Sequence, residues 1–202
     1  MSAARDAILA AVRAATAGGA APDLVVRAYG RVGTRSPSEC VELLHERLVD
    51  YRATVRRVPI GDVGTAIAEA ASGRLAIPPG LDPAWRPPGA VEDHGLTPQE
   101  LDALDGVVTG CTLAIAETGT IVLAAGPNEG RRALTLVPDL HVCVVRSSQV
   151  VETVPEAFAG LAALELRPLT FVSGPSATSD IELKRVEGVH GPRQLVVVIA
   201  DE

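Results

Sequence analysis

The segment from Phe171 to Glu182 concentrates side chains that could bind an anion. An apolar run leads into a stretch of hydroxyl residues and one glycine, and a short helix is predicted after it. In open α/β sheets, ligands bind beyond the carboxyl ends of strands, where backbone N–H groups at a helix start favour an anion. On this hypothesis four hydroxyl groups would donate hydrogen bonds to a phosphate or a carboxylate. They belong to Ser173, Ser176, Thr178 and Ser179.

The same segment could instead be purely structural. Ser179 would then cap the following helix, and Pro175 would begin a turn. Asp180 and Glu182 argue against a phosphate, because they already place negative charge at the N-terminus of that helix. The sequence leaves anion binding and simple capping as open alternatives.

Two further turns carry groups suited to binding or proton transfer. Residues 126–132 form a turn-rich stretch that ends in Arg131 and Arg132, whose guanidinium groups can fork onto carboxylate or phosphate oxygens. The stretch matches neither the Walker loop nor G-x-G-x-x-G, so it does not predict nucleotide binding. In residues 188–193, His190 precedes a glycine and a proline and could carry a proton. A solvated turn at 126–132 and a hydrogen-bonded histidine at 190 are the structural alternatives.

Glu117 lies between two apolar runs, which predicts a carboxylate at the tip of a hairpin. Gly119 can adopt the positive φ that such a tip requires. Glu117 could act as a nucleophile or a general base, or it could merely solvate the turn. His141 and Cys143 share one face of a predicted strand, a spacing that two metal ligands could use. Packing inside a buried strand is the preferred interpretation of that pair.

Helices that position these groups are marked by hydroxyl residues followed three positions later by Glu, the pattern of a capping box. A further Ala-rich helix is predicted from Val63 to Ala71, ending near Gly73. An amphipathic helix is predicted from Ala4 to Ala15, ending near the glycines at 18 and 19. The capping boxes are Ser36–Glu39, Thr97–Glu100, Thr153–Glu156 and Ser179–Glu182.

Short, nearly continuous apolar runs predict strands, and the run at 195–199 is typical of a strand buried on both faces. Strands that alternate with helices predict an α/β fold with a mainly parallel sheet flanked by helices, and a local antiparallel pair is expected around Glu117. The proline-rich stretch 78–95 is expected to be a long, stiff connection, either a lid or the boundary between the helical N-terminal part and the sheet core. The predicted strands are Thr54–Val58, Arg74–Ile77, Gly106–Thr109, Thr112–Ala116, Thr120–Ala124, His141–Arg146, Thr170–Ser173 and Gln194–Ala200.

Length and composition predict one domain over residues 1–202, with a helical N-terminal part to residue 52 and an α/β core from residue 53. The 47% hydrophobic content supplies enough apolar surface that neither a disulfide nor a structural metal is needed. A net charge of -7 and 2% aromatic residues argue against nucleic-acid binding. We expect a protein of the cytoplasm, because an odd number of scattered cysteines fits a reducing compartment. We also expect it to be soluble, because the N-terminus lacks the uninterrupted apolar region of a signal peptide and no apolar stretch is long enough to span a membrane.

Three motifs occurring in this order resemble the LUD-domain family, of the lactate utilization protein C type. They are Ala116–Thr120, Ser173–Glu182 and Gly188–Arg193, and Leu136–His141 before a strand also fits. The resemblance extends from Gly106 to the end and more loosely over the preceding helices. It implies an α/β fold like that of the CoA-transferases and sugar-phosphate isomerases.

The resemblance also implies a part in the oxidation of L-lactate to pyruvate in bacteria, together with two iron–sulfur partner proteins. The three cysteines of this chain, at 40, 111 and 143, include no C-x-x-C pair. We therefore expect no cofactor in this chain, and iron–sulfur clusters in its partners. The catalytic candidates are Glu117, Asp180 and His190. The candidates for binding a small organic acid or another anionic metabolite are Thr118, Gly119, Thr120, Arg131, Arg132, Ser173, Gly174, Ser176, Thr178, Ser179, Glu182, Gly191 and Arg193.

Two other functions remain open at this point. The chain could be a stand-alone enzyme for a phosphorylated or CoA-linked metabolite, with Glu117 as base or nucleophile and Arg131, Arg132 or Arg193 holding the anion. It could also be a non-catalytic module that binds an organic acid through its hydroxyl groups. All three hypotheses require that the three loops lie side by side along one rim of the sheet.

Overall fold

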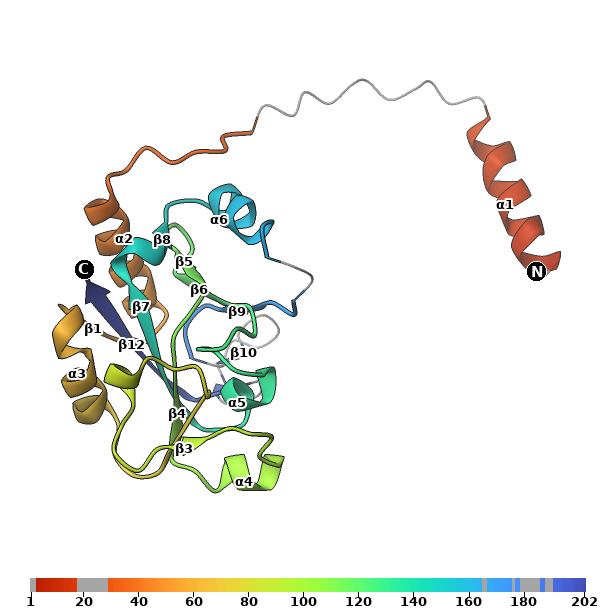
Figure 1. The fold of residues 1–202 in the computed structure, drawn as a ribbon. Helices are drawn as coiled ribbons and strands as arrows, with labels where there is room; N and C mark the ends of the chain where they lie inside the picture. The colour runs from red at the N-terminus through yellow and green to blue at the C-terminus, as the bar shows by residue number, and fades with distance from the viewer. Residues whose placement is uncertain (1–2, 18–28, 165–166, 176, 179–185, 188–190) are drawn as a thin grey trace.

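The computed structural model describes residues 3–17, 29–164, 167–175, 177–178, 186–187 and 191–202 (Figure 1). The helix expected after Ser179 lies outside the described residues. So do five of the candidate site residues, Ser176, Ser179, Asp180, Glu182 and His190.

The main sheet has six strands in the order β1-β12-β7-β4-β2-β3, and every neighbouring pair is parallel. The central strands are buried on both faces, which explains their continuous apolar sequences. The predicted mainly parallel α/β fold is confirmed. The strands are β1 (Thr54–Pro59), β2 (Leu75–Ile77), β3 (Val91–Glu92), β4 (Gly106–Thr109), β7 (Leu140–Arg146) and β12 (Gln194–Asp201).

A second sheet has the order β8-β5-β6-β9. Its strands are β5 (Leu113–Ile115), β6 (Thr120–Leu123), β8 (Val150–Val151) and β9 (Thr170–Val172). β6 pairs antiparallel with both β5 and β9, which confirms the antiparallel pair expected around Glu117. A short antiparallel pair joins β10 (Ala177–Thr178) to β11 (Val186–Glu187).

Three of the predicted capping boxes form in full. Ser36, Thr97 and Thr153 each accept a hydrogen bond from the backbone N–H three residues later, and the glutamate there bonds back to the cap. No helix in the described ranges is long and apolar enough to cross a membrane. The helices are α1 (Ala3–Thr16), α2 (Pro37–Asp50), α3 (Val63–Ala70), α4 (Pro98–Asp102), α5 (Arg132–Leu136) and α6 (Val154–Leu161), with 3-10 turns η1 (Ile60–Asp62), η2 (Pro83–Trp85) and η3 (Ser147–Gln149).

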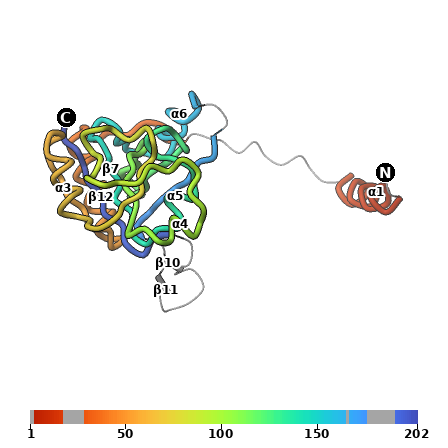
Figure 2. The backbone as a smooth tube through the Cα atoms, turned by 60° about the horizontal axis from the view of Figure 1, so that its bottom comes forward, coloured from red at the N-terminus to blue at the C-terminus, as the bar shows by residue number. Residues whose placement is uncertain are grey.

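Each face of the main sheet has its own apolar core. α2 and the second sheet cover one face, where Leu44 and Leu48 pack with Ile121 and Val197. α3 and η2 cover the other face, where Ile67 and Trp85 join Val144 and Val198. α1 has no buried residue and stands apart from the rest of the described chain (Figure 1, Figure 2).

The proline-rich stretch 78–95 contains the edge strand of the main sheet, β3, and does not form a lid. Within it, β3 adds a parallel strand to β2, and Trp85 is 4% exposed. The Arg146 guanidinium lies 4.9 Å from the centre of the Trp85 ring. The expectation of a lid is wrong because apolar residues at 81 and 85 anchor the stretch in the core.

Truncating Leu48, which is fully buried under the sheet, should destabilise the fold strongly. Leu48→Ala leaves a cavity in the core, so we expect the free energy of unfolding to fall by about 2–5 kcal/mol in urea denaturation. Val49→Ala is the matched control, because Val49 is 49% exposed and should change stability by less than about 0.5 kcal/mol. Equal losses from the two variants would contradict the placement of α2 on the core.

Candidate functional site

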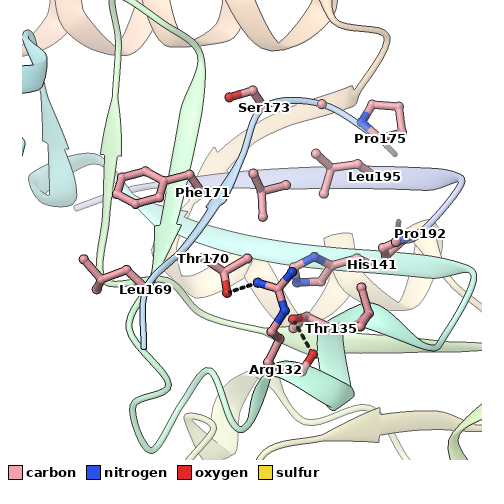
Figure 3. A pocket seen from close by; sticks show the side chains of 14 residues that line it. Arg132, Thr135, His141, Leu169, Thr170, Phe171, Ser173, Pro175, Pro192 and Leu195 are labelled. Carbon is pink, nitrogen blue, oxygen red and sulfur yellow. Dashed lines mark hydrogen bonds between the residues drawn. The ribbon is translucent and has the colours of Figure 1, made fainter. Parts of the chain in front are cut away.

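A cavity of about 450 Å³ opens between the main sheet and the second sheet (Figure 3). One wall is the start of β7 and β12 with the residues just before β12, and the other consists of α5 and β9 with the turn after it. The cavity thus lies at the amino ends of the two central parallel strands, and not beyond their carboxyl ends as expected. Its lining residues are Arg132, Thr135, Leu136, His141, Leu169, Thr170, Phe171, Val172, Ser173, Gly174, Pro175, Gly191, Pro192 and Leu195.

Arg132 is the charged side chain among these lining residues, and no Asp or Glu is among them. Its Nη1 donates a hydrogen bond to Thr170 Oγ1 at 3.2 Å, which holds the guanidinium beside the hydroxyl group at the start of β9. Among the described residues Arg132 has no carboxylate partner. A guanidinium without a counter-ion, beside several hydroxyl groups, is suited to binding a carboxylate or a phosphate.

His141 is the buried polar side chain on the opposite wall. It is 2% exposed and lines the cavity from the second position of β7, whose following residues are apolar up to Val145. Its Nε2 lies 2.8 Å from Thr109 Oγ1 on the neighbouring strand β4. This hydrogen bond fixes the ring, because the imidazole must keep a partner for its buried nitrogen.

Two buried thiols lie near this hydrogen bond, Cys143 two positions after His141 on β7 and Cys111, which contacts Cys143. Thr109 Oγ1 donates to Cys143 Sγ at 3.9 Å. The hydrogen bond from Cys111 is the main cause that lowers the pKa of the Cys143 thiol to about 6 against the effect of burial, whereas the pKa of Cys111 is raised well above its usual value. In the described ranges no group of three His, Cys, Asp or Glu side chains could hold a metal ion.

The structure brings the first two of the predicted loops together through hydroxyl groups. Thr118 Oγ1 donates to Thr120 Oγ1 at 2.8 Å, and Thr120 Oγ1 lies 2.8 Å from Ser173 Oγ. Ser173 and Gly174 line the cavity, while Thr118 and Thr120 stand behind Ser173. Of the third loop, Gly191 lines the same cavity.

Two glycines allow these loops to approach α2 and the residue that follows it. A Cβ on Gly119 would lie 2.6 Å from the Arg47 Cβ, and a Cβ on Gly174 would lie 2.7 Å from the Tyr51 carbonyl oxygen. Both glycines have positive φ, +59° and +82°. Their lack of a side chain therefore sets how closely the hairpin tip and the β9 turn pack.

The remaining candidates are not part of the cavity. Glu117 is exposed at the hairpin tip, and its backbone N–H bonds to the Glu152 carbonyl oxygen at 3.0 Å. Arg193 is exposed and forms a forked ion pair with Asp139 at 2.6 and 2.7 Å. Thr178 belongs to β10, which pairs with β11.

Arg131, although adjacent to Arg132, braces a different part of the fold. Its guanidinium donates to both carboxylate oxygens of Asp93 at 2.8 and 2.9 Å and to the Leu96 carbonyl oxygen. Burial raises the pKa of Asp93, but the hydrogen bonds from Arg131 and from the backbone N–H groups of Leu96 and Gly95 outweigh it and hold that pKa below its usual value.

Two hydroxyl residues on the cavity wall, Thr135 and Thr170, were not predicted as site residues from the sequence. The sequence predicted His141 only as a packed residue or a metal ligand. The sequence does contain an indication for His141, because a histidine near the start of an apolar strand is buried and needs a hydrogen-bond partner there. Its partner Thr109 is 32 positions earlier in the chain, so the pairing requires knowledge of the strand order.

Comparisons with known proteins identify relatives over most of the chain. The model of the LUD domain matches residues 83–200. A lactate utilization protein C of Deinococcus radiodurans is 47% identical over 81% of this chain and 82% of its own length. A lactate utilization protein C of Shouchella clausii is 29% identical over 52% of this chain and 47% of its own length.

A solved structure has the same fold. The crystal structure of a DUF162 family protein from Deinococcus radiodurans superposes with a TM-score of 0.73 and 38% sequence identity. The match covers 83% of this chain and 99% of that protein.

Replacing Asp93 by Asn should show how much the Arg131 brace contributes to stability. The lowered pKa means that the ionised carboxylate stabilises the fold above the unfolded-state pKa of about 3.9, and that this contribution is lost as the pH falls through the lower folded-state pKa. We therefore expect Asp93→Asn to be less stable than the wild type at pH 7, with a difference that narrows below about pH 4. Urea denaturation at pH 7 and pH 3 measures it, and a difference that does not depend on pH would contradict the assignment.

Proposed function

Because the chain belongs to the LUD domain family, and because its relatives are named lactate utilization protein C, we propose that it is a subunit of a bacterial system that oxidises L-lactate to pyruvate. The names of the relatives support a role in lactate utilization. In this proposal the chain binds the organic acid, and iron–sulfur partner proteins accept the electrons.

The observation that carries the proposal is the Arg132 guanidinium in the cavity, which has no carboxylate partner among the described residues. Arg132 supplies a fixed positive charge, and the lining residues that the structure describes contain no carboxylate that could neutralise it. Thr135, Thr170 and Ser173 add hydroxyl groups, while leucine, valine and proline side chains complete the wall. A few polar groups within a mostly apolar wall are typical of sites for small molecules, and about 450 Å³ is within their usual size range.

Lactate oxidation removes two electrons and two protons from C2 of the acid and its hydroxyl group. A chain with three cysteines and no C-x-x-C pair offers no self-contained set of ligands for an iron–sulfur cluster. We therefore place the clusters in the partner proteins, and assign to this chain the binding and orientation of the acid.

A stand-alone enzyme that uses Glu117 as base or nucleophile has less support from the geometry. Glu117 is not among the residues that line the cavity, and Arg131 and Arg193 already pair with Asp93 and Asp139. Glu117, Arg131 and Arg193 are therefore not among the residues that surround the cavity at Arg132.

Removing the guanidinium of Arg132 should weaken the binding of L-lactate. A charge-assisted, forked hydrogen bond contributes about 1.5–3 kcal/mol, so we expect Arg132→Ala to raise the dissociation constant by about 10-fold to 100-fold in isothermal titration calorimetry. Arg193→Ala is the matched control, because it removes an exposed arginine outside the cavity and should leave the affinity unchanged.

The role as a subunit is tested separately by reconstitution. Iron–sulfur proteins should co-purify with this chain from lactate-grown cells, and native mass spectrometry would report the complex together with any retained acid. Full lactate oxidation by the partner proteins without this chain would refute the proposal. Equal lactate affinity of Arg132→Ala and the wild type would refute the assigned binding site.

A further inference from the structure

His141 occupies an unusual position for a histidine, buried in the central parallel sheet and yet on the wall of the cavity (Figure 3). The neighbouring strand residues are apolar, so the imidazole is costly to bury unless its nitrogens have partners. Nε2 has such a partner in Thr109, which is itself fully buried.

The hydrogen bonds of Thr109 determine which nitrogen of His141 carries the proton. The Thr109 hydroxyl has one proton, and it points to Cys143 Sγ at 3.9 Å. The same oxygen must then accept a hydrogen bond from His141, which requires a proton on Nε2. Cys143 uses its own proton to donate a hydrogen bond to the Gly110 carbonyl oxygen at 3.6 Å, which leaves the sulfur lone pairs to accept from Thr109. In the neutral ring, Nδ1 is consequently the atom with a free lone pair.

The two walls of the cavity therefore offer complementary groups. Arg132 has only donors, which match the acceptor oxygens of a carboxylate. His141 offers an acceptor in Nδ1, which matches a hydroxyl proton. Leu195 is paired with His141 in the register of β12 and β7 and supplies apolar surface beside the imidazole.

We propose that His141 determines specificity by accepting a hydrogen bond from the 2-hydroxyl group of the acid that Arg132 binds, and that Thr109 is the residue that positions the ring. The cavity then selects 2-hydroxycarboxylates over carboxylates that lack the hydroxyl group. This inference rests on the proposed function, since it takes the carboxylate site at Arg132 as given.

The test compares L-lactate with propionate, which differs only by the missing hydroxyl group, using isothermal titration calorimetry. The wild type should bind L-lactate about tenfold more tightly, the equivalent of one hydrogen bond of about 1.4 kcal/mol. His141→Leu removes the acceptor and fills a similar volume. It should reduce the lactate-to-propionate preference to about one while changing propionate affinity by less than about twofold.

A second pair of variants tests the positioning role without altering the imidazole. Thr109→Val keeps the shape of the side chain but loses the 2.8 Å hydrogen bond, and it should lower the preference for lactate. Thr109→Ser restores the hydroxyl group and should restore the preference. If His141→Leu does not fold, this pair decides the matter, and equal preferences in Thr109→Val and Thr109→Ser would overturn the proposal.

The outcomes separate this inference from the proposed function. If the wild type binds both acids equally and Arg132→Ala loses both, the carboxylate site stands and the role of His141 is overturned. If His141→Leu loses both acids to the same extent, its role is structural and the inference is again overturned. If the wild type binds neither acid, the proposed site itself fails and the inference falls with it.

Discussion

The hydrogen bond between Thr109 and His141 is the interaction on which the geometry of the cavity depends. Both residues belong to strands enclosed on two faces, where an unpaired polar group costs about 1–3 kcal/mol. The bond ties β4 to β7 through their side chains, in addition to the backbone ladder, and fixes the imidazole at the amino end of β7. The sheet can therefore bury a histidine in its centre and still present its ring to the cavity, provided that the strand order brings Thr109 beside it.

The second wall of the cavity depends on how closely the small sheet packs against α2. Gly119 and Gly174 permit backbone contacts that any side chain would block, and the bond between Thr120 and Ser173 joins the two turns that carry them. β9 is thereby held across from β7, and the cavity is the space left between the two sheets. Its position at the amino ends of the central strands follows from this second sheet, because the expectation for a single open sheet places a ligand at the opposite end.

The sequence predicts what is local and not what depends on distant partners. The capping boxes at Ser36, Thr97 and Thr153 form as expected because all of their hydrogen bonds lie within four residues. The apolar runs locate eight strands to within one position, but the two-residue strands β3 and β8 were not predicted. The division into two sheets could not be read in this way, since it depends on pairings such as β6 with β9. Arg131 and Arg132 are equivalent in the sequence, yet Asp93, 38 positions earlier, engages only the first. The expected anion-binding helix start after Ser179 lies outside the described residues and stays a prediction.

The charge distribution explains why recognition of an anion must be local in this protein. A chain with a net charge of -7 repels anions at long range, so electrostatic steering cannot supply the affinity. Most arginines of the described chain are paired with carboxylates, as Arg57 is with Asp201 and Arg193 with Asp139. Arg132 differs because the neighbours that the structure describes are hydroxyl groups and apolar side chains, which screen its charge less than water does. Selectivity then depends on the few groups that face the cavity, and in our proposal His141 on the opposite wall distinguishes one carboxylate from another where charge alone cannot.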